Sequence, residues 1–560
     1  MKNLLVLFLI GVVGACSSSD PNEDDLTKDL GEWVDGGIDL EGGEADQVGG
    51  DSADDGGGWA DEHVSPDDAA TPEDVGSGGD SGGGDDDASV RPADPYSVET
   101  AWKFAPGLLT PVVIRSAVGP ITKTVTVTVG NQSQKVQLYR GLGSGSFVTT
   151  GSEAIAVKVT GTDGFTTTTL SAQMRPERTL SGVLTGDDLV WTDDKDIVLS
   201  SDVTIPQGET LTVGSGVRVK AAAKVNLVVE GAMEALGTKE EPILFAAKDN
   251  NPWGGVRVMG GSALLNETWF TGGGGDGTFA FGHSKSQPVV FAQSGVVTLN
   301  GGGVVDNPGK AFGGKDATVT LTDTLVSRCD TGGEFEDSWV NMNGAYVVEI
   351  PNGDGLAADD DNDCVYLVGA MIEDGAERVS TLTNIVFFAG KDDGIDHNNA
   401  RVLVDGAWIE NMAHEGVAAS NGRGIVVKNS VVRKNNQGIE AGYGAPDVVV
   451  DHCLVVENQV GLRFGDEYDW KATGKLTVKN TISVKNSKNN VLNDDTGSGG
   501  EVPGAIDIQC SMVNDSEWDG KGGNLPGVPS WDSYGCLLDG SPGKNAACDG
   551  NDVGVACFGD

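Results

Sequence analysis

The sequence predicts an all-β protein whose main part is a solenoid of stacked coils. Short apolar segments centred on a glycine recur at intervals of 22, 22 and 23 residues, at Gly394, Gly416, Gly438 and Gly461. A second apolar strand follows each of them and ends at Asn411, Asn435, Asn458 or Asn486. A fixed period of about 22 residues with two short strands is typical of a solenoid. A β-sandwich with regularly spaced strands is the alternative interpretation.

Stacking would give each coil the core that it cannot form alone. We expect one buried apolar ladder, made of Ile395, Val417, Ile439 and Leu462. The asparagines at the corners are expected to form a second ladder with bonds from side chain to side chain. Small residues stand five positions before the last three asparagines, namely Ser430, Cys453 and Thr481. The 84 glycines suit a chain with many tight corners.

The first 15 residues have the features of an export signal. An apolar run from Leu4 to Val13 follows Lys2 and is too short to span a membrane. Residues 13–16, Val-Gly-Ala-Cys, resemble the bacterial lipobox. That resemblance implies cleavage before Cys16, lipidation of Cys16 and, with Ser17 next to it, anchoring at the outer membrane or cell surface. An ordinary secretory signal with a chance cysteine is the alternative.

Residues 16–95 are predicted to be a disordered acidic tether. Between Asp20 and Asp94 there are 25 acidic residues and only two basic ones, a net charge of −23 out of −47 for the whole chain. Low hydrophobicity with high like charge leaves a segment extended and without a core. The remainder is acidic as well, which argues against nucleic acid as a partner.

Residues 96–180 are predicted to form a small β-sandwich of the immunoglobulin-like type. Apolar and polar residues alternate strictly over 122–141, and a second such stretch covers 154–170. Period-2 segments between Gly and Asn turn signals are typical of antiparallel strands. The segment has no cluster of catalytic residue types, so we expect a spacer or adhesive module.

Residues 181–510 are predicted to be the solenoid itself, and their start carries a resemblance. The stretch 202–247, with "GETLTV", "VEGAMEALGT" and "PILF", closely resembles the entry coils of bacterial right-handed parallel β-helix proteins, and Trp253 to Val256 continue that pattern. The chain thereby looks like the pectate-lyase-like superfamily. The resemblance implies a right-handed parallel β-helix.

Residues 511–560 resemble the terminal segment of such proteins and are interpreted as a cap that closes the open last coil. Export permits disulfides. Two local pairs are plausible, Cys510–Cys536 and Cys548–Cys557, although sequence does not fix the connectivity. Cys453 is expected to be an unpaired core residue.

Acidic residues occupy equivalent positions of successive coils, which lie about 4.8 Å apart in a stack. One row is predicted to contain Asp393, Glu415 and Gln437, with Asp354 one coil earlier. A second row is predicted to contain Asp396, Ala418, Glu440 and Arg463. Two carboxylates about 5 Å apart repel by roughly 3 kcal/mol at an effective dielectric constant near 20. Such a row favours a hard cation, and calcium is the expected ion.

The resemblance implies roles for these residues. In the uronate lyases of this superfamily, calcium binds the sugar carboxylate and an arginine or lysine removes the C5 proton. Carried over, the calcium ligands would be Asp392, Asp393, Asp396, Glu415 and Glu440, and the base would be Arg463 or Arg423. The local arginine signatures of those lyases are absent, as is the pattern of the polygalacturonase branch. His414 precedes Glu415, but this fragment is too short to match the pattern.

Sugar contacts are expected from Tyr443, Tyr468 and Trp470 in loops between strands, with His397 at the rim of the acids. Residues 357–364 begin like an EF-hand loop but carry Cys364 where glycine is required, so they are interpreted as a coil insertion. Three hypotheses follow for what we expect to be a monomer: recognition of an acidic polysaccharide or surface partner with calcium, a β-helix lyase or glycoside hydrolase, and a structural surface protein. In the last, the acids would only be a solvated face.

Overall fold

The computed structural model describes residues 94–99, 103–150, 154–350, 361–468 and 470–556. The predicted signal peptide, Cys16 and the tether up to residue 93 lie outside these residues, as do Asp354 and Cys557. The described part is nearly all β, and the prediction of an all-β chain dominated by a right-handed parallel β-helix is confirmed. No described helix is long and apolar enough to cross a membrane.

Two antiparallel sheets form the predicted sandwich. One sheet has the order β1 (Tyr96–Val98), β3 (Leu109–Ser116), β6 (Leu142–Val148). The other has the order β2 (Lys103–Phe104), β8 (Gly164–Ala172), β7 (Ala154–Gly161), β4 (Lys123–Val129), β5 (Gln132–Leu138), with β2 parallel to β8. Val112, Val127 and Phe147 are among the residues buried between the sheets. β3 and β6 are buried almost throughout, whereas burial alternates along β4. The strict alternation in the sequence reflects this one-sided burial.

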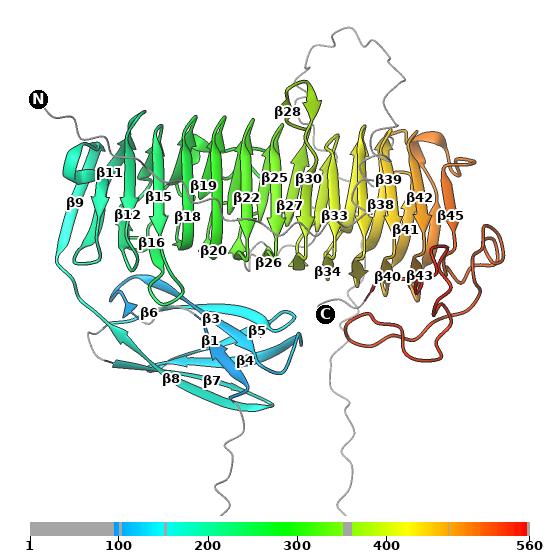
Figure 1. Ribbon diagram of the computed structural model, residues 1–560, viewed down its shortest axis with the longest axis horizontal. Helices are drawn as coiled ribbons and strands as arrows, with labels where there is room; N and C mark the ends of the chain where they lie inside the picture. Colours follow the sequence, from blue (N-terminus) through cyan, green and yellow to red (C-terminus); the bar gives the residue numbers. More distant parts are fainter. Residues whose placement is uncertain (1–93, 100–102, 151–153, 351–360, 469, 557–560) are drawn as a thin grey trace, which may run out of the picture. The chain divides into compact units, whose positions relative to one another are not determined.

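The β-helix sheet begins at β9 (Glu177–Val183), ahead of the predicted start at 181, because β9 pairs in parallel with β11 (Asp196–Ile205). The short η1 (Gly186–Leu189) and β10 (Val190–Trp191) lie between them. Each later coil contributes one strand to each of three faces, and strands of successive coils lie side by side in Figure 1.

Face A carries the acidic residues. After the second half of β11 it consists of β14 (Asn226–Val229), β17 (Gly255–Met259), β19 (Val290–Gln293), β21 (Phe312–Lys315), β24 (Gly333–Glu336), β27 (Val365–Val368), β32 (Ile395–Asn398), β35 (Glu415–Asn421), β38 (Gln437–Gly444), β41 (Val460–Phe464) and β44 (Asn489–Asn493).

Face B follows face A along the chain. It consists of β12 (Thr210–Val213), β15 (Ala232–Leu236), the first halves of β18 (Ser262–Thr271) and β20 (Val296–Asn307), β22 (Thr318–Thr322), β25 (Trp339–Asn343), β30 (Ser380–Thr383), β33 (Val402–Asp405), β36 (Gly424–Lys428), β39 (Asp447–Asp451), β42 (Lys475–Lys479) and β45 (Ile506–Gln509).

Face C completes each coil. It consists of the first half of β11, β13 (Arg218–Ala221), β16 (Ile243–Ala247), the second halves of β18 and β20, β23 (Leu325–Cys329), β26 (Tyr346–Ile350), β31 (Val386–Gly390), β34 (Trp408–Glu410), β37 (Val431–Arg433), β40 (Leu454–Val456) and β43 (Ile482–Val484). Outside the three faces lie a hairpin, β28 (Ile372–Glu373) with β29 (Ala376–Glu377), and the turns η2 (Gly277–Phe279) and η3 (Thr496–Ser498).

The predicted apolar ladder is confirmed. Ile395 pairs with Val417, Val417 with Ile439 and Ile439 with Leu462, and all four side chains are fully buried. The repeated glycines have a separate physical reason, which is close approach of the backbone. A Cβ atom on Gly394 would lie 2.5 Å from the carbonyl oxygen of Gly416, one coil further on. Any side chain at these positions would therefore collide with the next coil.

The predicted asparagine ladder forms, but mostly with a different pattern of bonds. The backbone N–H groups of Met412, Asn435 and Asn458 donate to the side-chain oxygens of Asn435, Asn458 and Asn486, at 2.8, 2.9 and 3.0 Å. The bond from side chain to side chain is made between Asn458 and Asn486. Asn411 is exposed and one position out of register, because Met412 occupies its place. The prediction for Asn411 is therefore wrong.

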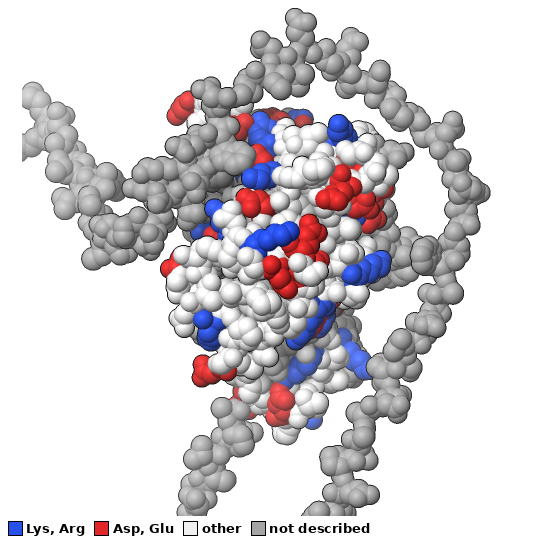
Figure 2. All heavy atoms as spheres, turned by 90° about the vertical axis from the view of Figure 1, so that its right-hand side faces the viewer, with Lys and Arg blue, Asp and Glu red and all other residues white. Residues whose placement is uncertain are grey.

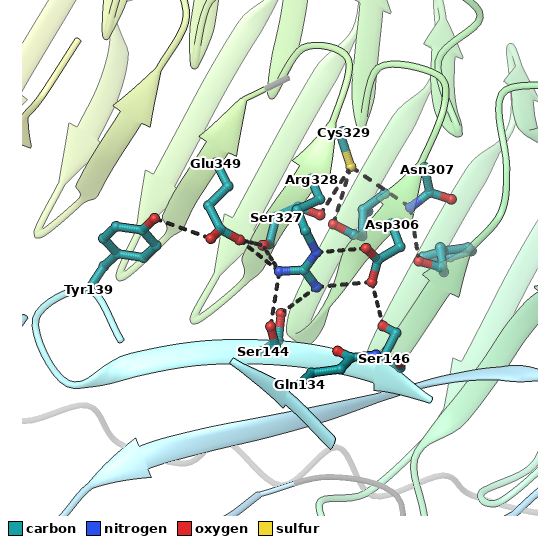
Figure 3. Close-up of polar contacts among 12 residues, drawn as sticks. Gln134, Tyr139, Ser144, Ser146, Asp306, Asn307, Ser327, Arg328, Cys329 and Glu349 are labelled. Carbon is teal, nitrogen blue, oxygen red and sulfur yellow. Dashed lines mark hydrogen bonds and ion pairs between the residues drawn. The ribbon is translucent and has the colours of Figure 1, made fainter. Parts of the chain in front are cut away.

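The sandwich packs on the outer side of face C through both apolar and charged contacts. Leu108 and Val113 join a cluster with Trp269 and Val348 of the β-helix. Arg328 points toward β6 and is held between Asp306 and Glu349, as Figure 3 shows. Its Nη1 donates to the Ser144 carbonyl oxygen at 3.0 Å, and Ser146 Oγ donates to Asp306. Burial lowers the pKa of Arg328, but the two carboxylates more than offset this and raise it.

The C-terminal segment packs against the β-helix in two places. Trp518, within the predicted cap 511–560, and Val502 just before that segment pack against the core of the β-helix. Val553 and Val555 join Val431, Leu454 and Ile482, which point outward from face C, in another cluster, so this part covers a side of the solenoid.

The predicted disulfide pairs are wrong, because Cys510 is bonded to Cys548. Cys453 is unpaired and buried as expected, and so are Cys329 and Cys364. All three thiols lie in the core of the β-helix. They therefore serve as small core residues rather than as partners for the C-terminal cysteines.

Candidate functional site

A cavity of about 250 Å³ opens on face A over β27, β32, β35 and β38. It is lined by the acids that the stacking of the coils brings together, with aromatic and amide side chains around them. The lining residues are His283, Asp361, Tyr366, Asp392, Asp393, Asp396, Asn398, His414, Glu415, Ala418, Ala419, Ser420, Gln437, Glu440, Tyr443, Asp466, Glu467 and Tyr468.

The outward row of face A follows the predicted order. Asp396 pairs with Ala418, Ala418 with Glu440, and Glu440 with Arg463. Tyr366 precedes Asp396 in the same row. Ala418 has no side chain beyond its methyl group and lies between two acids, so it leaves the space into which the neighbouring carboxylates project.

A second row lies at the turn just before these strands. The Glu415 N–H donates to Asp393 Oδ1 at 2.7 Å, and the Asp393 N–H donates to Asp363 Oδ1 at 3.3 Å. Gln437 Nε2 donates to Glu415 Oε1. The register of Val365 with Ile395 places Asp363 one coil before Asp393, in the position that was predicted for Asp354. Asp354 itself lies outside the described residues.

Asp363 is part of the core of this site rather than of a loose insertion. It belongs to the stretch 357–364, which is interpreted from the sequence as a coil insertion. In the structure Asp363 is 3% exposed. One carboxylate oxygen each from Asp363, Asp393 and Asp396 lie within 4.8 Å of one another. The sequence signal was present in the alternate acids Asp361 and Asp363, but the coil boundary hid their register.

His414 forms a second group with Asp392 and Asp393, whose possible ligand atoms also lie within 4.8 Å of one another. His414 Nδ1 is 2.7 Å from Glu415 Oε2, 3.5 Å from Asp392 Oδ1 and 3.7 Å from Asp393 Oδ1. Burial lowers the pKa of His414, but Asp392 and Glu415 outweigh it and raise the pKa to about 11. Asp392 Oδ1 is buried and accepts no hydrogen bond from any described residue. The sequence reading set His414 aside and missed this role.

The carboxylates outnumber the positive charges that face them. Burial raises the pKa of Asp363, Asp393 and Asp396 well above the usual value, and the neighbouring acids raise it further. Burial and Glu415 raise the pKa of Glu440 as well, although Arg463 opposes them. A buried group of like charges requires either protons or a cation.

The residues present fit a hard divalent cation. Carboxylate oxygens from Asp363, Asp392, Asp393 and Asp396 are the donors that calcium prefers, and His414 adds a nitrogen that borderline metals accept. Asp392 Oδ1 accepts no hydrogen bond from a described residue and lies 3.5 Å from His414 Nδ1, so it supplies a buried acceptor that a cation would satisfy. Glu415 and Glu440, the other two predicted ligands, line the same cavity.

Neither arginine predicted as a base lines the cavity. Arg463 is 3% exposed; it donates to the Gly465 carbonyl oxygen at 2.9 Å and to Glu467, and its Nε is 3.8 Å from Glu440. Arg423 donates to Glu377 at 2.6 Å and to the Asn399 carbonyl oxygen at 2.8 Å. The five predicted metal ligands therefore line one cavity, whereas Arg463 contacts Glu440 without lining it and Arg423 is paired with Glu377.

The predicted sugar-contacting aromatics gather at one end of the cavity. Tyr443 and Tyr468 line it, and the ring of Trp470 lies 5.5 Å from that of Tyr443. Tyr468 and Trp470 are more than half exposed. Tyr366 and His283 line the opposite end, with ring centres 4.4 Å apart, and sequence reasoning missed both. His283 comes from a distant loop, so no periodicity indicates its position.

The expected place of His397 at the rim is wrong. Successive side chains of a strand point to opposite faces, so Asp396 points outward and His397 points into the core, fully buried. His397 Nε2 lies 2.6 Å from the Ala400 carbonyl oxygen, and Nδ1 has no partner among the described residues. Burial lowers the pKa of His397 to about 4.

This histidine should make stability depend on pH. His397 takes up a proton near pH 6.5 in the unfolded chain but only near pH 4 in the folded chain. The folded state therefore has its full stability with respect to this group above pH 6.5 and loses stability as the pH falls toward 4. The free energy of unfolding should fall by about 3 kcal/mol over this range. Urea unfolding of wild type and His397→Leu at pH 7 and pH 4.5 measures it. The difference in the free energy of unfolding between the two proteins should be smaller at pH 4.5 than at pH 7. A difference that is independent of pH would contradict this assignment.

Acidic and basic side chains are interspersed with neutral ones on the end of the molecule nearest the last coils (Figure 2). On that view the surface is not uniformly acidic.

Residues 182–297 match the family model described as a pectate-lyase-like β-helix domain, which confirms the recognition made from 202–247. Among solved structures, a double mutant of the periplasmic alginate epimerase AlgG is 11% identical, with a TM-score of 0.41 over 56% of this chain and 77% of that chain. The alginate lyase AlyF-OU02 in complex with G6 is 14% identical, with a TM-score of 0.36 over 56% and 75%. The pectate lyase Pel9A is 14% identical, with a TM-score of 0.29 over 65% and 87%. No curated protein matches the chain.

Proposed function

We propose that the cavity on face A binds a divalent cation of the calcium type and, through it, the carboxylate of an acidic polysaccharide. One observation carries this proposal. Asp393 and Glu415 of successive coils line one cavity with Asp392, and Asp363 of the preceding coil places a carboxylate oxygen within 4.8 Å of those of Asp393 and Asp396. The buried Asp392 Oδ1 accepts no hydrogen bond from a described residue and has His414 Nδ1 at 3.5 Å. A cation would satisfy that oxygen and offset the surplus of negative charge.

The alternative of a merely solvated acidic face does not fit these acids. Asp363, Asp393 and Glu415 are at most 6% exposed, so water screens them poorly. Exposed acids would repel one another little, whereas buried ones repel strongly. Burial of this kind is maintained when a ligand or ion compensates it.

An acidic sugar suits the surroundings of the acids. Polar side chains of Asn398, Ser420 and Gln437 line the cavity and offer hydrogen bonds to hydroxyl groups. Tyr443 and Tyr468 at its edge offer flat apolar rings to the carbon face of a sugar. The bound cation would attract the sugar carboxylate, which the acids alone would repel.

Binding without chemistry is the function that the geometry supports best. Elimination by the mechanism of the uronate lyases needs a base beside the sugar, and neither Arg463, paired with Glu467, nor Arg423, paired with Glu377, lines the cavity. We further propose that a lipid on Cys16 anchors the chain at a bacterial outer membrane. The acidic segment after it would hold the β-helix away from that surface.

The test is binding of oligogalacturonate and of its carboxyl-reduced, neutral counterpart, each with calcium and with a chelator. We expect the acidic oligomer to bind only with calcium and the neutral one to bind at least about tenfold more weakly. Asp393→Asn should abolish the calcium dependence, and Asp316→Asn, an exposed acid outside the cavity, should not. Equal binding of both oligomers with and without calcium would refute the proposal.

A further inference from the structure

The part of face A that precedes the cavity is covered by the segment between β18 and β19, residues 272–289. The guanidinium of Arg257 in β17 lies 3.7 Å from the ring centre of Phe279. Phe281 packs against Phe291 in β19, with ring centres 5.1 Å apart. Lys310 Nζ donates to the Phe281 carbonyl oxygen. The segment therefore lies along the outer side of β17, β19 and the turn before β21.

Two acids hold the far end of this segment. The His283 N–H donates to Glu334 Oε1 at 2.7 Å, and Glu334 also pairs with Lys310. Ser286 Oγ donates to Asp330 Oδ2 at 2.5 Å. Lys310 is fully buried and Glu334 is 5% exposed, so these bonds are screened little by water. The cover is thus a fixed part of the fold.

The cover ends where the cavity begins. The His283 ring lies against Tyr366 of β27, with His283 Nε2 and the Tyr366 hydroxyl 3.4 Å apart, and both residues line the cavity. At the other end, Glu467 and Tyr468 line it from the turn after β41. Asp466 fixes that turn, because the Tyr468 N–H donates to Asp466 Oδ1 at 2.6 Å. Both ends along the solenoid axis are therefore walled.

The space between the walls is short. Four steps from β27 to β41, at about 4.8 Å each, give roughly 19 Å along the axis. A volume of about 250 Å³ lies just below the range of about 300–1,000 Å³ typical of sites for drug-sized ligands. A site of this volume suits one or two sugar rings, and a longer chain lying along face A would meet His283 and Tyr366.

We infer that this site takes the end of an acidic glycan chain, or a short oligosaccharide, rather than the interior of a long polymer. The inference rests on the proposed function and specifies its ligand. His283 with Tyr366, and Glu467 with Tyr468, would determine this specificity by blocking continuation of the chain in either direction along the axis.

The experiment uses calorimetry to compare the binding of galacturonate oligomers and polymers of defined length to the full chain in the presence of calcium. If only ends bind, a polymer about ten times longer should need about ten times more mass for half-saturation, with one protein per chain. Several proteins per chain, in proportion to its length, would overturn the inference and leave the proposed function intact. Absence of binding at every length would refute both.

A second arm tests the wall itself. His283→Ala with Tyr366→Ala removes the two rings at that end, while Phe279 and Phe281 still hold the cover. We still expect one protein per long chain, because Glu467 and Tyr468 remain, but a chain could now continue past the opened end. The gain in affinity from trimer to hexamer should therefore be at least about tenfold larger than in the wild type. An equal gain in the variant and the wild type would contradict the assignment of this wall. Circular dichroism establishes that the variant is folded.

Discussion

Replacing Gly416 with alanine is expected to destabilise the β-helix by about 3 kcal/mol or more. The new Cβ atom would lie 2.5 Å from Val432 Cγ1 and 2.7 Å from the Gly438 carbonyl oxygen. The carbonyl belongs to the backbone of the next coil, so it cannot rotate away as a side chain would. Because every coil rests on the next, the strain should spread to the register of Glu415 and Ala418 beside the cavity.

The measurement is urea unfolding followed by circular dichroism, with Gly277→Ala as the matched control. Gly277 has open space around a Cβ atom and does not adopt a left-handed conformation, so its variant should change stability by less than about 0.5 kcal/mol. A Gly416→Ala protein as stable as Gly277→Ala would show that the coils are not packed at this distance.

Replacing Arg328 with methionine should loosen the sandwich from face C. Arg328 lies between Asp306 and Glu349 and also donates to Ser144 (Figure 3). Methionine keeps the apolar part of the side chain but leaves two carboxylates facing each other without a cation. Removing one partner of a buried ion pair costs about 3–5 kcal/mol. The carboxylates here are 19% and 28% exposed, so we expect about 2–3 kcal/mol.

Differential scanning calorimetry should show this loss as a lower melting temperature or as separate melting of the sandwich. Arg115→Met is the control, because its pair with Glu99 is 49% and 37% exposed and should contribute less than about 1 kcal/mol. A melting temperature of Arg328→Met equal to that of the control would contradict the role of this arginine.

Periodicity predicted the fold and half of the site because both depend on regular stacking. The spacing of Gly394, Gly416, Gly438 and Gly461 is enough to align Asp396, Ala418, Glu440 and Arg463, and the structure has that alignment. Alternation along a strand also explains the error for His397, since neighbours on β32 point to opposite sides.

The remainder of the site depends on irregular segments. Asp363 stands 30 residues before Asp393 instead of about 22, because the β28–β29 hairpin lengthens that coil, so a fixed period selects the wrong residue. His283 reaches the cavity through a loop fixed by Glu334 and Lys310, contacts that sequence spacing does not encode. The same applies to the bond between Cys510 and Cys548.

Calcium titration by calorimetry on residues 94–560 tests the central claim most directly, with Asp393→Asn, Asp396→Ala and Asp316→Asn measured alongside. We predict one saturable site in the wild type and in Asp316→Asn. Affinity should fall at least about tenfold in Asp393→Asn and Asp396→Ala, because each removes a carboxylate from the same group of ligand atoms. No binding by the wild type, or equal binding by all four proteins, would contradict a cation site on face A.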